Sequence, residues 1–112
     1  MVTLADERSA RTEALFRDVN ERIAESAEGF DADEADFVCE CGEQACTERV
    51  SATLDEYERV RADGTRFLIR PGHENERIER VVERRSRFAV VEKFQHRVVA
   101  IVRKLDPRVE SI

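Results

Sequence analysis

The chain has 112 residues, of which 39% are charged and 41% hydrophobic, and its formal net charge is −6 at pH 7. This length predicts one domain with a single core. No apolar run approaches the roughly 18 residues that a membrane-spanning helix needs, which excludes an integral membrane protein. Residues 1–8 lack the pattern of a secretory signal, so we expect a cytoplasmic location in which the three cysteines stay reduced.

The two halves of the chain differ in charge. Residues 1–56 carry a balance of −11 and residues 57–112 a balance of +5. Such halves either attract each other within the fold or meet different partners. Solvated charged faces are the normal state of a small domain's surface, so the asymmetry alone assigns no function.

The first predicted element is an amphipathic helix over residues ~6–28, because Phe16, Val19, Ile23 and Ala27 recur at steps of three and four residues. Gly29 is well placed to cap this helix. Residues 30–36 are acidic and without periodicity, which predicts an exposed connection. We therefore expect an N-terminal helix over 1–30 and a small α+β unit over 31–112, together forming one structural domain.

The remaining elements are short. Residues 37–40 and 46–52 have extended character, and Thr53 to Glu56 forms a capping box that starts a helix ending near Gly64. Residues 66–70 are predicted to form a strand that ends at a Pro-Gly turn, and the pattern of residues 81–91 favours two strands over a helix. Apolar residues at helical spacing predict a last helix over residues 98–105. The predicted fold class is α+β, with a long N-terminal helix, a cysteine loop, a short central helix, a small mostly antiparallel sheet and a C-terminal helix.

One group of residues carries recognisable chemistry. Three cysteines lie within eight positions, and a histidine follows a Pro-Gly turn: the set is Cys39, Cys41, Cys46 and His73. Cys3His is a standard tetrahedral zinc set, and Gly42 would allow the tight curl that the Cys-x-Cys spacing requires. Four protein ligands leave no open position, so the site would be structural. Glu74, next to the histidine, is a candidate to orient its ring.

Other roles for the cysteines remain open. An iron–sulfur cluster also takes four such ligands, although the spacing matches no ferredoxin pattern. A redox dithiol would normally use Cys-x-x-Cys spacing, which is absent. A disulfide between Cys39 and Cys41 would be strained by its small loop.

The second half of the chain is rich in arginine and offers a possible basic interaction surface, made of Arg77, Arg80, Arg84, Arg85 and Arg87. Glutamates interleave with these arginines, which favours a self-paired, solvated surface over a nucleic-acid interface. His96 is expected at the surface or at a helix cap. No nucleophile motif or phosphate-binding glycine loop is present, so an enzyme is disfavoured.

Several segments together resemble a family of small uncharacterised actinobacterial proteins. They include Cys39-Glu40-Cys41-Gly42 with Cys46, Glu56-Tyr57-Glu58, and Pro71-Gly72-His73-Glu74, and the likeness extends over about residues 13–108. Residues 94–100 depart from the glycine-containing sequence expected there. The resemblance implies no activity, substrate or partner.

The residues thus predict a small zinc-binding, non-enzymatic interaction or regulatory protein, most simply with a protein partner. The N-terminal helix would either pack on its own domain or serve as a partner-binding or dimerising helix. The alternatives are a nucleic-acid-binding regulator using the arginine-rich half and a redox or iron–sulfur sensor.

Overall fold

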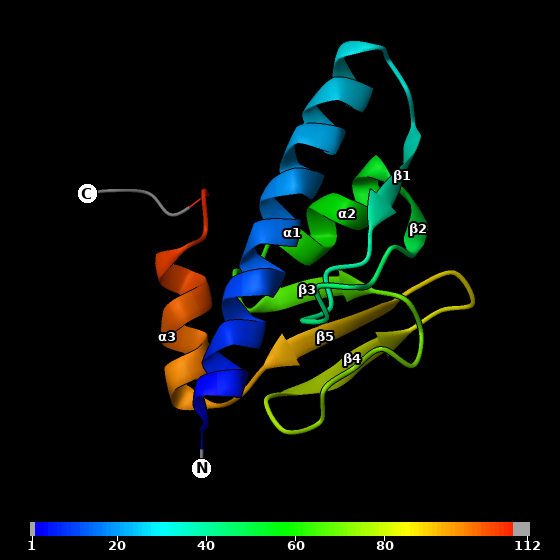
Figure 1. Ribbon diagram of the computed structural model, residues 1–112. Coiled ribbons are helices and arrows are strands. Elements are labelled where there is room, and N and C mark those ends of the chain that lie inside the picture. Colours follow the sequence, from blue (N-terminus) through cyan, green and yellow to red (C-terminus); the bar gives the residue numbers. More distant parts are fainter. Residues whose placement is uncertain (1, 109–112) are drawn as a thin grey trace.

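A single long helix, α1 (Leu4–Gly29), runs the length of the molecule and packs along the remaining elements (Figure 1). The architecture comes from a computed structural model that describes residues 2–108. Thr3 and Asp6 start α1 with a capping box, in which each side chain accepts a hydrogen bond from the other residue's backbone N–H at 3.0–3.1 Å. The helix begins two residues earlier than its apolar pattern predicts because this cap, and not the pattern, sets its first turn.

The end of α1 differs from the prediction. Gly29 is still helical, Phe30 is the C-cap, and Asp31 takes the left-handed conformation with φ of 55°. An acidic residue tolerates this conformation better than most non-glycine residues. The predicted exposed connection over 30–36 is also too long, because Glu34 already belongs to a strand.

Within residues 2–108, five strands form two small antiparallel sheets. In the first, β1 (Glu34–Val38) pairs with β2 (Arg49–Thr53). In the second, the order is β3-β5-β4, with β3 (Arg66–Ile69), β5 (Ala89–Lys93) and β4 (Glu79–Arg84). The strands favoured over residues 81–91 are therefore confirmed.

Two short helices complete the fold and follow the predicted signals. Thr53 caps α2 (Leu54–Arg61) through the expected capping box with Glu56. Gln95 caps α3 (His96–Lys104), which lies beside α1. The α+β fold class and the order of its elements are as the sequence predicts.

The core lies between α1, the two sheets and α2. Phe37 from β1 stacks on Tyr57 from α2, with ring centroids 4.5 Å apart, and both residues are fully buried. Phe67, Leu68 and Ile69 on β3 extend this core toward β5. Among the described residues, no helix is both long and apolar enough to cross a membrane.

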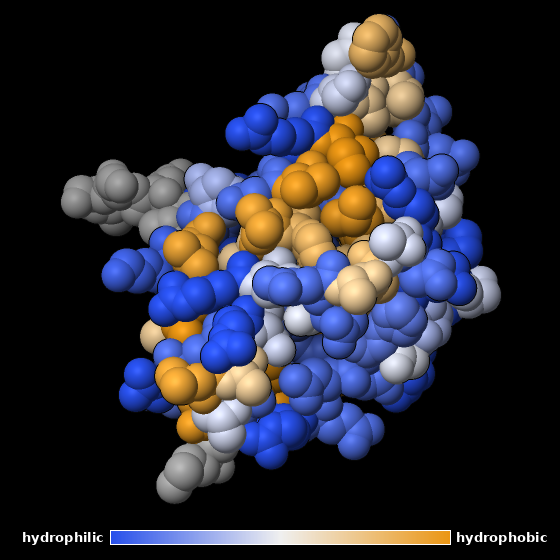
Figure 2. All heavy atoms as spheres, in the orientation of Figure 1, coloured by the Kyte–Doolittle hydropathy of each residue, from blue (hydrophilic) through white to orange (hydrophobic). Residues whose placement is uncertain are grey.

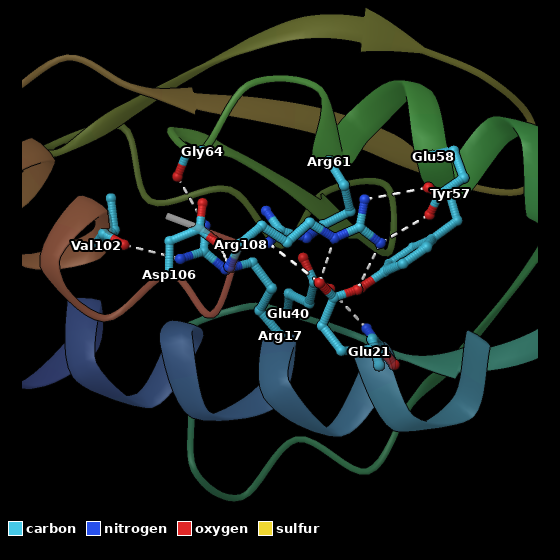
Figure 3. Close-up of polar contacts among 11 residues, drawn as sticks. Arg17, Glu21, Glu40, Tyr57, Glu58, Arg61, Gly64, Val102, Asp106 and Arg108 are labelled. Carbon is cyan, nitrogen blue, oxygen red and sulfur yellow. Dashed lines mark hydrogen bonds and ion pairs between the residues drawn. The ribbon is translucent and has the colours of Figure 1, made fainter. Parts of the chain in front are cut away.

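The face that α1 turns inward is polar. Its buried residues include Glu13, Arg17 and Asn20, with Ala10 and Ala14 between them. Arg17 is fully buried and donates to the backbone carbonyls of Gly64 at 2.7 Å and Val102 at 2.8 Å (Figure 3). The charged Arg17 side chain thus attaches α1 to the loop after α2 and to α3 through hydrogen bonds that it donates. Hydrogen bonds from a charged donor are stronger than those between neutral groups.

Polar contacts from three elements surround this attachment (Figure 3). Tyr57 donates to Glu21 on α1 at 2.9 Å, and Arg61 on α2 contacts both Glu21 and Asp106. Arg108 also pairs with Glu21. These residues link α1, α2 and the segment after α3 into one network.

A second buried group joins α1 to the larger sheet. Lys93 on β5 contacts Glu13 on α1 and Glu79 on β4, and all three side chains have at most 1% exposure. Burial raises the pKa of Glu13 well above its usual range. A protonated Glu13 beside the Lys93–Glu79 pair leaves the group without net charge, which lowers the cost of burying it.

Replacing Arg17 with Ala should destabilise the protein strongly. The change removes the Arg17 donor from one buried and one partly buried carbonyl and removes a side chain that packs 4.4 Å from the Phe67 ring centroid, so we expect a loss of about 3 kcal/mol or more. Urea unfolding measures the loss. Arg59→Ala, at an exposed position of α2, is the control and should change stability by less than about 0.5 kcal/mol. Equal stability of the two variants would contradict the attachment described above.

Candidate metal centre

The three cysteines lie on the loop that connects β1 to β2. The hairpin ladder continues one step past β1, where the Cys39 N–H donates to the Glu48 carbonyl at 3.1 Å. Beyond this point residues 40–47 leave the ladder, and a turn at Glu43 is closed by the Cys46 N–H. The loop thereby folds back on itself and directs three sulfur atoms to one place.

The fourth residue arrives from a turn after β3. The His73 N–H donates to the Arg70 carbonyl at 3.1 Å, and Gly72 has φ of 90°. Proline at the second position and a glycine with positive φ at the third match a type II turn. The Pro-Gly turn predicted from the sequence therefore does bring the imidazole back to the cysteine loop.

The candidate ligand atoms form a tight group. All of them lie within 4.8 Å of one another: the three Sγ atoms and a ring nitrogen, from Cys39, Cys41, Cys46 and His73. His73 Nδ1 is 3.6 Å from Cys39 Sγ and 3.8 Å from Cys46 Sγ. Zinc–ligand bonds of about 2.3 Å to sulfur and about 2.0 Å to nitrogen in a tetrahedron place such atoms about 3.6 Å apart. The predicted Cys3His set therefore fits a single metal ion.

The surroundings of the three thiols shift their pKa values in different directions. The Arg70 N–H donates to Cys39 Sγ at 3.2 Å. A hydrogen bond from Cys39 lowers the pKa of Cys41 to about 5, and the same bond together with burial raises the pKa of Cys39. Burial also raises the pKa of Cys46. A metal ion must therefore displace thiol protons as it binds, as is usual for thiolate sites.

Glu40, between the first two cysteines, anchors the loop from behind. Its side chain is fully buried: Oε1 accepts from the Leu68 N–H at 2.8 Å, and Oε2 accepts from Asn20 Nδ2 at 2.7 Å. The Glu40 N–H also donates to the Leu68 carbonyl at 2.8 Å. Asn20 in turn holds both backbone groups of Val38 at 2.8–2.9 Å. The ligand loop is thus fixed to β3 and to α1 at the same residue.

The roles of Glu40 and Asn20 were not predicted from the sequence. A signal for the first was present, because two cysteines at i and i+2 that face one metal place the residue between them on the opposite side, toward the interior. No comparable signal existed for Asn20, whose partners lie 18 and 20 positions along the chain.

Burial raises the pKa of Glu40 to about 7, despite the hydrogen bonds from Leu68 and Asn20.

Gly42 serves a purpose different from the expected curl. A Cβ atom at this position would lie 2.7 Å from the Cβ of Ser9 on α1, so only glycine allows the loop to approach the helix this closely. Beside this contact is a hollow of about 240 Å³, lined in part by Cys41 and His73. It gives an ion a route from solvent to the ligands.

The other predicted site residues lie elsewhere. Glu74 Oε2 is 3.8 Å from Arg84, so one of its carboxylate oxygens faces the sheet, and its role beside His73 stays a prediction. The five arginines of the possible basic surface each contact a carboxylate: Asp6 for Arg77, Glu92 for Arg80, Glu74 for Arg84, Glu56 and Glu83 for Arg85, and Glu56 for Arg87. His96 is exposed at the start of α3.

Comparisons with known proteins add no family to this geometry. No protein-family model matches the chain, and neither curated proteins nor solved structures contain a match. The resemblance to small actinobacterial proteins therefore stays a prediction, and the site must be interpreted from its own residues.

Replacing Glu40 with Gln should weaken metal binding. An amide cannot accept from both Leu68 and Asn20, so the ligand loop loses one anchor, and residues that orient metal ligands typically contribute 10- to 100-fold in affinity. Competition with a chromophoric chelator for Zn²⁺ measures the change. Glu43→Gln, an equal charge change at an exposed position of the same loop, should stay within about threefold of the wild type. Equal losses in both variants would mean that charge, and not the anchor, controls affinity.

Proposed function

We propose that this chain is a small zinc-binding, non-enzymatic interaction or regulatory protein with a structural Cys3His site. The observation that carries the proposal is the convergence of four ligand atoms within 4.8 Å from two separate segments of the chain. One segment is the β1–β2 loop and the other is the turn after β3. Such a group of soft and borderline donors suits zinc better than calcium or magnesium, which prefer oxygen ligands.

The spacing of the ligands supports one ion over an iron–sulfur cluster. A cluster distributes its ligands over several iron atoms and therefore needs them farther apart than the ligands of a single ion. Here the Sγ atoms of Cys39 and Cys46 both approach one nitrogen of His73 at 3.6 and 3.8 Å. A mononuclear tetrahedral site is the simplest occupant of this space.

A structural role follows from the number and setting of the ligands. With four protein ligands, zinc has no position left for a water molecule or a substrate, so it would stabilise the fold and would not activate a nucleophile. Cys39 and Cys41 are 2–3% exposed, and Glu40 between them is fully buried. The ion would hold the hairpin loop against the turn that follows β3.

A protein partner is favoured over nucleic acid. The five arginines of the possible basic surface already contact carboxylates of the same chain, which reduces the positive charge available to phosphates. The overall charge of −6 also disfavours a polyanionic partner.

Elemental analysis of purified protein tests the metal assignment. We expect one zinc ion per chain in the wild type and little or none in Cys41→Ser and His73→Ala, because three ligands hold zinc much more weakly than four. His96→Ala, which removes an exposed histidine on α3, is the matched control and should keep its zinc. Full zinc occupancy in His73→Ala would refute the assignment of His73 as the fourth ligand. Iron in the purified protein, together with visible absorbance, would refute the zinc assignment and support the iron–sulfur alternative.

A further inference from the structure

The outer side of α1 carries an apolar stripe that the fold leaves partly uncovered. It consists of Leu15, Phe16, Val19 and Ile23 on the helix and Phe30 at its C-cap. Leu15 is 60% exposed, Val19 39% and Phe30 85%. Figure 2 shows hydrophobic side chains gathered over this part of α1. We call these five residues the outer stripe.

Part of the stripe lies outside the core, because α1 turns Arg17 and Asn20 inward. Ile23 is partly buried and packs against the core, whereas Leu15, Val19 and Phe30 are exposed. Apolar residues exposed together at helical spacing are typical of a surface that binds another helix. Packing within residues 2–108 therefore covers only part of the apolar periodicity of α1.

The stripe complements itself about Val19. When two copies of α1 pack antiparallel around a two-fold axis at this residue, position i of one copy lies level with position 38 − i of the other. Leu15 then faces Ile23 of the other copy. Arg8, which is exposed, faces Phe30, an arrangement that suits a cation–π contact. In this register the apolar contacts are Val19 with its own copy and Leu15 with Ile23, while Phe16 and Phe30 lie level with Arg22 and Arg8.

The charges beside the stripe follow the same symmetry. Asp18 of one copy lies about 3 Å along the axis from Arg22 of the other, and Arg11 lies equally close to Glu25, given a rise of about 1.5 Å per residue. Both pairs combine opposite charges. Within residues 2–108, Arg11, Arg22 and Glu25 make no ion pair in the single chain. The arginines on the sheets, by contrast, already contact carboxylates.

We propose that the protein forms a two-fold symmetric dimer in which the α1 helices of two copies pack antiparallel through the outer stripe. The inference deepens the proposed interaction role by naming a second copy of this chain as the partner, and it rests on that role but not on the metal. Val19 lies on the axis, and each dimer contains two Asp18–Arg22 and two Arg11–Glu25 pairs. Because both copies use the same surface, this isologous contact gives a closed dimer and does not extend into a filament.

Light scattering coupled to size-exclusion chromatography tests the dimer. The wild type at about 100 µM should elute with twice the chain mass, and Val19→Glu should be a monomer, because two carboxylates would meet on the axis. Val82→Glu is the matched control: Val82 on β4 is also 39% exposed but lies on the larger sheet, so this variant should stay dimeric. A monomeric wild type, or a dimeric Val19→Glu, would overturn the proposal.

A charge exchange tests the antiparallel register. Arg11→Glu and Glu25→Arg each place like charges opposite each other in their own homodimers, and each should raise the dissociation constant roughly tenfold. Mixing the two variants in equal amounts should restore wild-type affinity, because the heterodimer regains both opposite-charge pairs. Positions 11 and 25 lie about 21 Å apart along one helix, so no contact within a chain can produce this rescue. Absence of rescue would overturn the register.

Zinc content of the same samples separates this proposal from the metal site. A zinc-bound monomer would overturn the dimer and leave the Cys3His assignment standing. A zinc-free dimer would support the dimer and count against the metal assignment. If the wild type is monomeric and instead binds a different protein through α1, a second copy is the wrong occupant of the outer stripe.

Discussion

The position of the candidate metal site depends on one buried carboxylate, that of Glu40. It accepts hydrogen bonds from Leu68 on β3 and from Asn20 on α1, while its two neighbours in the chain are candidate ligands. A carboxylate without these donors would not remain in the interior, because burying an unpaired charge costs several kcal/mol. The contact therefore couples three things: the register of the loop on β3, the rotation of α1, and the side of the loop to which the thiols point.

The same dependence explains why α1 presents its polar residues to the core. Asn20 holds Val38 and Glu40, and Arg17 holds the carbonyls of Gly64 and Val102. These bonds specify one rotation of the helix, since only one face carries both side chains at the required spacing. Packing of an apolar stripe would be less selective, because hydrophobic contacts have no direction. Leu15 and Val19 are left on another side of α1, where they partly face solvent.

The parts of the fold that could be predicted are those with local causes. The capping box at Thr53 and Glu56, the Pro-Gly turn before His73 and the grouping of three cysteines each depend on residues a few positions apart, and each occurs as expected. The inward face of α1 could not be predicted in this way. Arg17 finds its acceptors 47 and 85 positions later, and in the sequence it looks like one more exposed charge between apolar residues. Long-range polar contacts leave no periodic pattern, so apolar spacing alone does not show that Arg17 and Asn20 face the interior.

A bridge between Cys39 and His73 would close a segment of 34 positions that contains β2, α2 and β3. Closing a loop of this length restricts the unfolded chain by about 4 kcal/mol in the entropy model used for disulfides. Unlike a disulfide, a metal bridge is reversible and its contribution grows with the free concentration of the ion relative to its dissociation constant. The free energy of unfolding of this small domain would then rise with the concentration of free metal. The fraction of folded protein would therefore depend on that concentration.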